Sequence, residues 1–167
     1  DKKTFQKTFF AVAQNFLAKE NNEAALKAYK EIIDNKYENY KESMMGLGIV
    51  YYNLKDYDKA IYWLSEFSKE LPKENKEMVS YLIASALYRK GNTDEAISRF
   101  EGLANVSPST EYSRKAALYL IEIYSNRKDE AKVNFYLERI KGTKEYNTAM
   151  SMIGDLYVTK ENYDKAL

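Results

Sequence analysis

The sequence predicts an all-α protein built from stacked helix pairs. Along most of the chain, apolar residues recur at steps of three and four, the spacing that places side chains on one face of a helix. Only two prolines and six glycines interrupt the 167 residues. Because both residue types break helices, their scarcity favours an array of helices joined by short turns.

The clearest helix pair lies between residues 44 and 72. A polar turn through Lys55 and Asp56 separates two amphipathic segments, which are expected to pack against each other as antiparallel helices. Their apolar positions are Met44, Leu47, Gly48, Tyr51, Ala60, Leu64 and Phe67. The small residues Gly48 and Ala60 fall where the two helices would have to cross. Their small size predicts that the two helix axes lie close together at this crossing.

The same pattern recurs in one register along the whole chain. The position of Tyr51 recurs as Phe16, Leu87, Tyr124 and Tyr157, and that of Ala60, nine residues later in every copy, as Ala25, Ala96, Val133 and Ala166. The position of Leu47 recurs as Val12, Ile83, Leu120 and Ile153, and that of Gly48 as Ala13, Ala84, Ile121 and Gly154. A residue suited to cap a helix start stands between them each time, at Asn21, Asp56, Asn92, Asp129 and Asn162. Gly91, just before Asn92, is expected to leave the right-handed helical region at no steric cost.

This pattern resembles the tetratricopeptide repeat, whose signature is W-x2-L-G-x2-Y, then Ala-x3-Phe, then Pro. Pro72 and Pro108 close the second and third copies. The resemblance implies a right-handed α-solenoid of about four and a half helix pairs, forming a single array over residues 1–167. The expected copies span residues 6–40, 41–76, 77–113, 114–146 and 147–167. The fifth copy is cut off one turn into its second helix, so the native protein is expected to continue past Leu167.

Composition argues against several functions. The chain has 26 basic and 25 acidic residues, a net charge of +1, and therefore lacks the basic excess of a nucleic-acid-binding surface. It contains no apolar run of about 18 residues that could span a membrane. With neither cysteine nor histidine, it lacks the usual nucleophile, general base and metal ligands. We therefore expect no enzymatic activity, no metal site and no cofactor.

The resemblance also implies where a partner would bind. In the family, the first helix of each pair lines a concave groove that holds an extended peptide or a partner helix. By register with Gly48, the candidate groove residues are Phe10, Gln14, Met45, Ile49, Tyr52, Tyr81, Ser85, Tyr88, Leu118 and Glu122. Family members that hold a C-terminal carboxylate use a cluster of Lys, Arg and Asn, which these positions do not supply. An apolar and aromatic strip instead predicts a protein–protein interaction scaffold.

Two alternatives stay open at this point. The apolar strip could be covered by further parts of the protein or by a second copy, which would make the segment a structural spacer or a self-association module of a larger multi-repeat protein. Residues 108–117 resemble a repeat junction in bacterial envelope proteins, among them the Tol–Pal coordinator and the barrel-assembly lipoprotein. That resemblance favours the periplasm or the inner face of the outer membrane, with the cytoplasm as the alternative.

Overall fold

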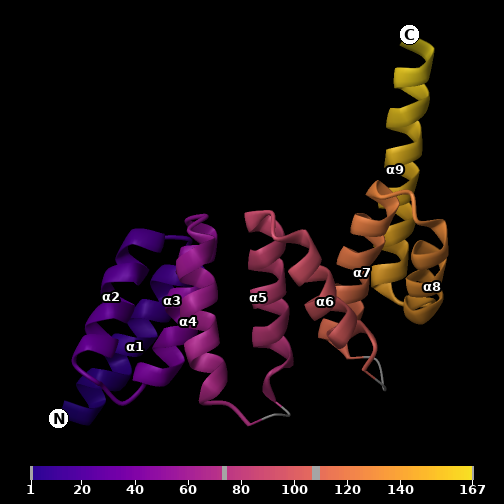
Figure 1. Cartoon of the computed structure of the whole chain (residues 1–167). Coiled ribbons are helices and arrows are strands. Elements are labelled where there is room, and N and C mark those ends of the chain that lie inside the picture. Colours follow the sequence, from indigo (N-terminus) through magenta and orange to yellow (C-terminus); the bar gives the residue numbers. More distant parts are fainter. Residues whose placement is uncertain (1, 73–74, 107–109, 167) are drawn as a thin grey trace. The chain divides into compact units, whose positions relative to one another are not determined.

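The computed structural model describes residues 2–72, 75–106 and 110–166, with side chains up to Leu156 (Figure 1). Its regular elements are α1 (Lys2–Ala18), α2 (Asn22–Asp34), α3 (Tyr40–Asn53), α4 (Tyr57–Lys69), α5 (Glu77–Lys90), α6 (Thr93–Ala104), α7 (Glu111–Asn126), α8 (Glu130–Ile140) and α9 (Lys144–Ala166). No strand occurs within the described ranges. The predicted all-α fold is confirmed.

The chain divides into two compact units, residues 1–96 and 97–167, and the boundary lies inside α6. In the first unit each helix packs on the next, from α1 through α5, and α1 also touches α3. The pairs α1/α2 and α3/α4 lie side by side as the repeat register predicts (Figure 1). In the second unit α7 packs on α8 and α9, and α8 also touches α9.

Most of the positions that repeat in the sequence are buried in the core. Leu47, Gly48, Tyr51 and Ala60 are all buried in the second copy. Their buried counterparts are Ala13, Ala25, Ile83, Ala84, Leu87, Ala96, Leu120, Ile121 and Tyr124. A Cβ atom placed on Gly48 would lie 2.5 Å from Cγ of Leu64, so α3 and α4 do cross where the small residue was expected.

One turn geometry joins the two helices of each of the first four copies. At the same register position, Glu20, Lys55, Gly91 and Lys128 have φ angles of 58°, 62°, 97° and 59°. The amide of the following residue donates to a carbonyl five residues back, for example Asp56 N to Tyr51 O at 2.9 Å. This is the hydrogen bond of a Schellman motif, which needs a left-handed residue after the helix. The behaviour predicted for Gly91 is confirmed, but three copies adopt it without glycine.

Three of the five capping residues predicted between the helices take their expected role. The side chains of Asn21, Asp56 and Asp129 accept hydrogen bonds from the amides of Ala24, Lys59 and Lys132, three residues later. Each bond satisfies one of the amides that a helix start leaves without an intrahelical partner.

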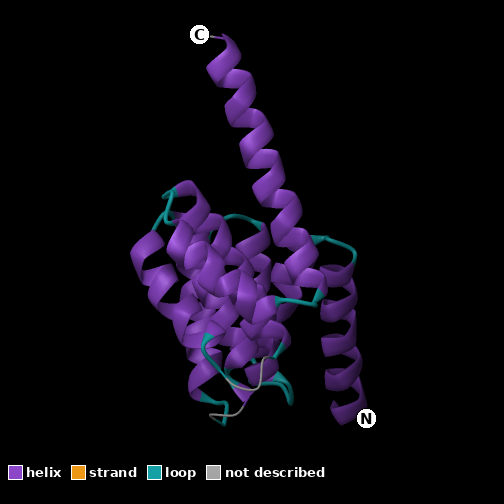
Figure 2. Ribbon diagram, turned by 90° about the vertical axis from the view of Figure 1, so that its right-hand side faces the viewer, coloured by secondary structure: helices purple, strands orange, loops and turns teal. Residues whose placement is uncertain are grey.

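The predicted turn at Asn162 does not form. Figure 2 shows α9 as one unbroken helix, which runs from Lys144 to Ala166 and passes through Asn162. Only Tyr163 to Leu167 follow in this sequence, and a separate helix of that length would form barely one hydrogen-bonded turn. Continuing α9 costs less than nucleating a new helix. Pro108 and the side chains of Tyr157 and Ala166 lie outside the described part of the chain.

Val12 is a second departure from the register. It is 40% exposed, whereas its counterparts Leu47 and Ile83 are buried. In the second and third copies, the second helix of the preceding copy packs on this face, α2 on α3 and α4 on α5. The corresponding outer face of α1, which includes Phe5 at 56% exposure, is open in the structure.

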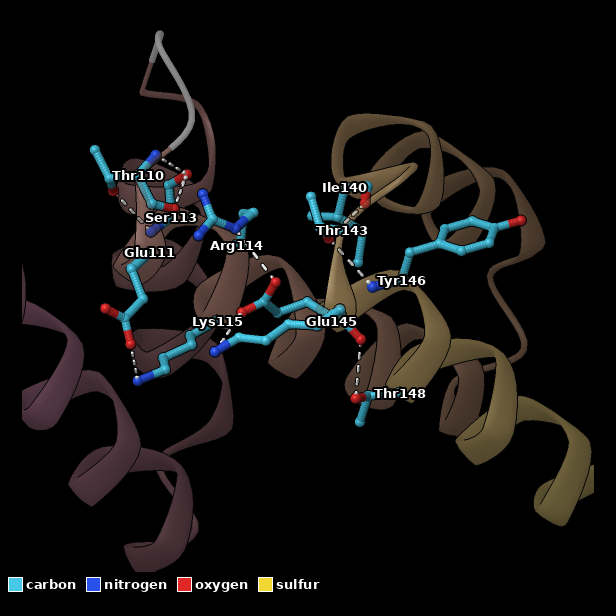
Figure 3. A network of polar contacts seen from close by, with 11 residues as sticks. Thr110, Glu111, Ser113, Arg114, Lys115, Ile140, Thr143, Glu145, Tyr146 and Thr148 are labelled. Carbon is cyan, nitrogen blue, oxygen red and sulfur yellow. Dashed lines mark hydrogen bonds and ion pairs between the residues drawn. The ribbon is translucent and has the colours of Figure 1, made fainter.

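Polar contacts hold the start of α9 on α7 (Figure 3). Nε of Arg114 donates to Oε2 of Glu145 at 3.2 Å, and the Glu145 side chain is 5% exposed. The Thr143 hydroxyl accepts a hydrogen bond from the amide of Tyr146 at 3.3 Å and so caps α9. At the start of α7, Thr110 and Ser113 form a reciprocal capping box.

A second polar cluster joins α6, α7 and α8. Oε1 of Glu101 accepts hydrogen bonds from the Tyr124 hydroxyl at 3.0 Å, from the Tyr136 hydroxyl at 3.3 Å and from Nζ of Lys132 at 3.0 Å. Partial burial acts to raise the pKa of Glu101, but the hydrogen bonds and the positive charge of Lys132 outweigh it and lower that pKa below its usual value. The ionised carboxylate therefore helps to hold the second unit together.

Candidate functional site

The predicted groove positions on α1 and α3 come together in the first unit. Phe10 and Gln14 lie one turn apart on α1, and Met45 and Ile49 lie one turn apart on α3, because residues four apart share a helix face. These four side chains line one cavity of about 370 Å³. A mainly apolar cavity of this size with a few polar groups is typical of a binding site.

The floor of the cavity comes from residues that the repeat register did not single out for the groove. The complete lining is Phe10, Gln14, Leu17, Ala18, Tyr29, Glu42, Met45, Gly46 and Ile49. Gly46 contributes no side chain, and the Tyr29 ring occupies the space above it: a Cβ atom on Gly46 would lie 2.4 Å from Cζ of Tyr29. Phe10 meets the same ring edge-on, with 6.3 Å between the centroids. The glycine on α3 therefore lets the aromatic ring from α2 pack directly against the α3 backbone at the cavity.

Few charges surround the cavity. Glu42 is the only charged residue in its lining, and no lysine or arginine contributes to it. Burial raises the pKa of Tyr29, so its phenol stays neutral at physiological pH. This lining cannot neutralise a carboxylate, and it favours an apolar or cationic group over an anionic one.

The other predicted groove residues lie outside the cavity lining. Tyr52 is half-buried and meets Tyr57 edge-on, with 5.7 Å between the ring centroids. Tyr81 and Tyr88 are half-buried on α5. On α7, in the second unit, Leu118 and Glu122 are also half-buried.

Ser85 is the most buried of the predicted groove residues. It is only 3% exposed, and its hydroxyl has no hydrogen-bond partner. Tyr81 and Tyr88 lie four residues before it and three after it, on the same face of α5, and both side chains are much longer. A serine between two such neighbours is short, and its side chain lies below the surface of this face.

Two further features bear on function. Within the described ranges, no helix is long and apolar enough to cross a membrane. In the same part of the chain, no three acidic, histidine or cysteine side chains cluster as they would around a metal ion.

Comparisons with known proteins support the array of helix pairs described above. The solved structure of a MamA double mutant (MamA RS-1 ArsTM) is similar over 97% of this chain and 98% of its own, with a TM-score of 0.63. At 20% sequence identity, this likeness concerns the fold alone. Two models of the tetratricopeptide repeat match residues 10–74 and 79–110, more than half of the 167 residues together. The chain belongs to the tetratricopeptide repeat family.

Proposed function

We propose that this interaction scaffold binds an apolar segment of another protein in the groove between α1 and α3. Membership of the tetratricopeptide repeat family supports the general role of a protein–protein interaction scaffold. The observation that carries the proposal is the cavity of about 370 Å³ formed by Phe10, Met45 and Ile49 above Tyr29. Aromatic residues and methionine dominate the buried centres of interfaces, and methionine adapts its shape to varied partners.

The same proposal assigns this chain neither a catalytic nor a nucleic-acid-binding role. The sequence has no histidine or cysteine, and its net charge is +1. The cavity lining contains one carboxylate and no basic side chain to serve as its catalytic partner. General acid–base work needs paired groups with suitable pKa values, and nucleic acid needs a basic surface.

Charged substitutions in the groove test the proposal. Ile49→Asp places a carboxylate where a bound partner would have to desolvate it, which costs several kcal/mol if the contact is buried. The matched control is Tyr62→Asp on α4, because Tyr62 is 57% exposed and lies outside the cavity. Partners captured from the source cells and quantified by mass spectrometry should be lost with Ile49→Asp and kept with Tyr62→Asp. Loss with both variants, or with neither, would place binding elsewhere.

Self-association is a second candidate, favoured by the open outer face of α1. Val12 and Phe5 are exposed on this face. Leu47, which corresponds to Val12 in the second copy, is covered by a helix. A second copy of the chain could supply such a helix. Light scattering after size-exclusion chromatography should then show a dimer that Val12→Glu converts to a monomer. A monomer at all concentrations would remove this candidate and leave the groove.

A further inference from the structure

The cavity contains polar groups whose hydrogen-bonding capacity is unused. Tyr29 is 2% exposed, and its ring carbon that bears the hydroxyl lies over Gly46 at the cavity floor. No hydrogen bond within the described residues involves the Tyr29 hydroxyl, the Gln14 amide or the Glu42 carboxylate. A ligand that forms hydrogen bonds with these three groups replaces the solvent there on binding.

The charge of the cavity has one sign. Glu42 is exposed at its wall and has no ion-pair partner among the described residues. Its neighbour Lys41 is already paired with Glu70, and that contact raises the pKa of Lys41. Lys7 lies one turn before Phe10 on α1 but outside the cavity lining. The cavity therefore carries one carboxylate, which attracts the neighbouring Lys41 but forms no ion pair among the described residues, beside an apolar hollow.

We propose that the partner segment is amphipathic and basic: a bulky apolar side chain fills the cavity, and a lysine or arginine beside it pairs with Glu42. This inference rests on the proposed function of the groove. The volume of about 370 Å³ has room for a side chain as large as leucine, phenylalanine or tryptophan. The Tyr29 hydroxyl and the Gln14 amide can both donate and accept hydrogen bonds, whereas the Glu42 carboxylate only accepts them, so a ligand that donates at Glu42 is preferred over one that only accepts. A cationic head also matches the single negative charge at the wall.

A random-peptide display library is the probe that tests this chemistry. Peptides that bind the wild-type chain should share a bulky apolar residue with a lysine or arginine within one helical turn. Glu42→Lys replaces the attraction between Glu42 and a basic peptide residue by repulsion. Because this ion pair is partly exposed, the substitution should weaken the binding of an enriched peptide roughly tenfold. The matched control Asp34→Lys makes the same charge change at the end of α2, outside the cavity lining, and should leave the affinity within about twofold. Raising the salt concentration should weaken wild-type binding and shrink the effect of Glu42→Lys.

Two variants that fill the cavity separate this inference from the proposed function. Gln14→Trp and Ala18→Trp place a large ring at exposed lining positions of α1, where no core packing is disturbed. Both should abolish peptide binding while circular dichroism melts stay unchanged. Suppose that the two tryptophan variants block the enriched peptides, but that these peptides contain no basic residue and bind Glu42→Lys as well as the wild type. That result would overturn the basic-partner inference and would still support binding in the groove. Peptides that bind despite both rings, or a library that yields no binders, would overturn the two proposals together.

Discussion

Replacing Gly46 by alanine tests the packing that shapes the cavity. The added Cβ atom would lie 2.4 Å from Cζ and 2.6 Å from both Cε atoms of Tyr29. The ring has to move, and Tyr29 is 2% exposed with the Phe10 ring packed edge-on against it. Overpacking of this kind costs about 1–3 kcal/mol. Alanine offsets up to about 1 kcal/mol of that through its better helix propensity, so Gly46→Ala should lower the free energy of unfolding by about 1–2 kcal/mol.

Urea unfolding followed by circular dichroism measures this loss, and a double-mutant cycle assigns it to the ring. In a Tyr29→Leu background the aromatic ring is absent, so Gly46→Ala should cost at least about 1 kcal/mol less than in the wild type. Gly102→Ala is the control that shows the effect of a glycine-to-alanine change without a clash, because no atom lies within 4 Å of a Cβ atom at that position. It should leave the stability unchanged or raise it by up to about 1 kcal/mol. Equal costs of Gly46→Ala in both backgrounds would refute the contact between Gly46 and Tyr29.

Three further outcomes are expected. Lys55→Gly should raise the free energy of unfolding by about 1 kcal/mol, because a left-handed φ costs a residue with a side chain roughly that much. Gly91→Ala should lower the free energy of unfolding by a similar amount for the same reason. Thermal melts of the two variants measure these changes. Asp56→Ala removes a helix cap and should cost about 0.5–2 kcal/mol in urea unfolding. The lowered pKa of Glu101 means that its contribution to stability is present above its usual pKa of 4.5 and is lost as the pH falls through the folded-state value. Glu101→Gln should flatten this acid dependence, and an unchanged pH profile would contradict it.

The sequence predicted the repeat core well because spacing alone decides it. Leu47, Gly48 and Tyr51 share one helix face, and Ala60 follows at a fixed distance in every copy, so burial follows from the register. The caps at Asn21 and Asp56 were predictable for a similar reason, since they depend only on local backbone geometry.

The cavity and the end of the chain could not be predicted in the same way. The hollow depends on Gly46 and Tyr29 meeting between α3 and α2, a contact between helices that no spacing within one helix reports. The Gly-Leu-Gly run at residues 46–48 was the available signal, since a second glycine beside the seam has no role in the repeat pattern. The burial of Ser85 depends on the length of its neighbours, and the missing turn at Asn162 on the cost of nucleating a short helix.

Site-specific photo-crosslinking tests most directly the claim that the groove between α1 and α3 is the partner-binding surface. Benzoylphenylalanine introduced at position 14 or 49 places a reactive group at the cavity, and at position 62 it places the same group on the exposed surface of α4. Irradiation of the source cells should join the same partner covalently at positions 14 and 49 and leave position 62 without an adduct. An adduct at position 62, with none at positions 14 and 49, would contradict the account.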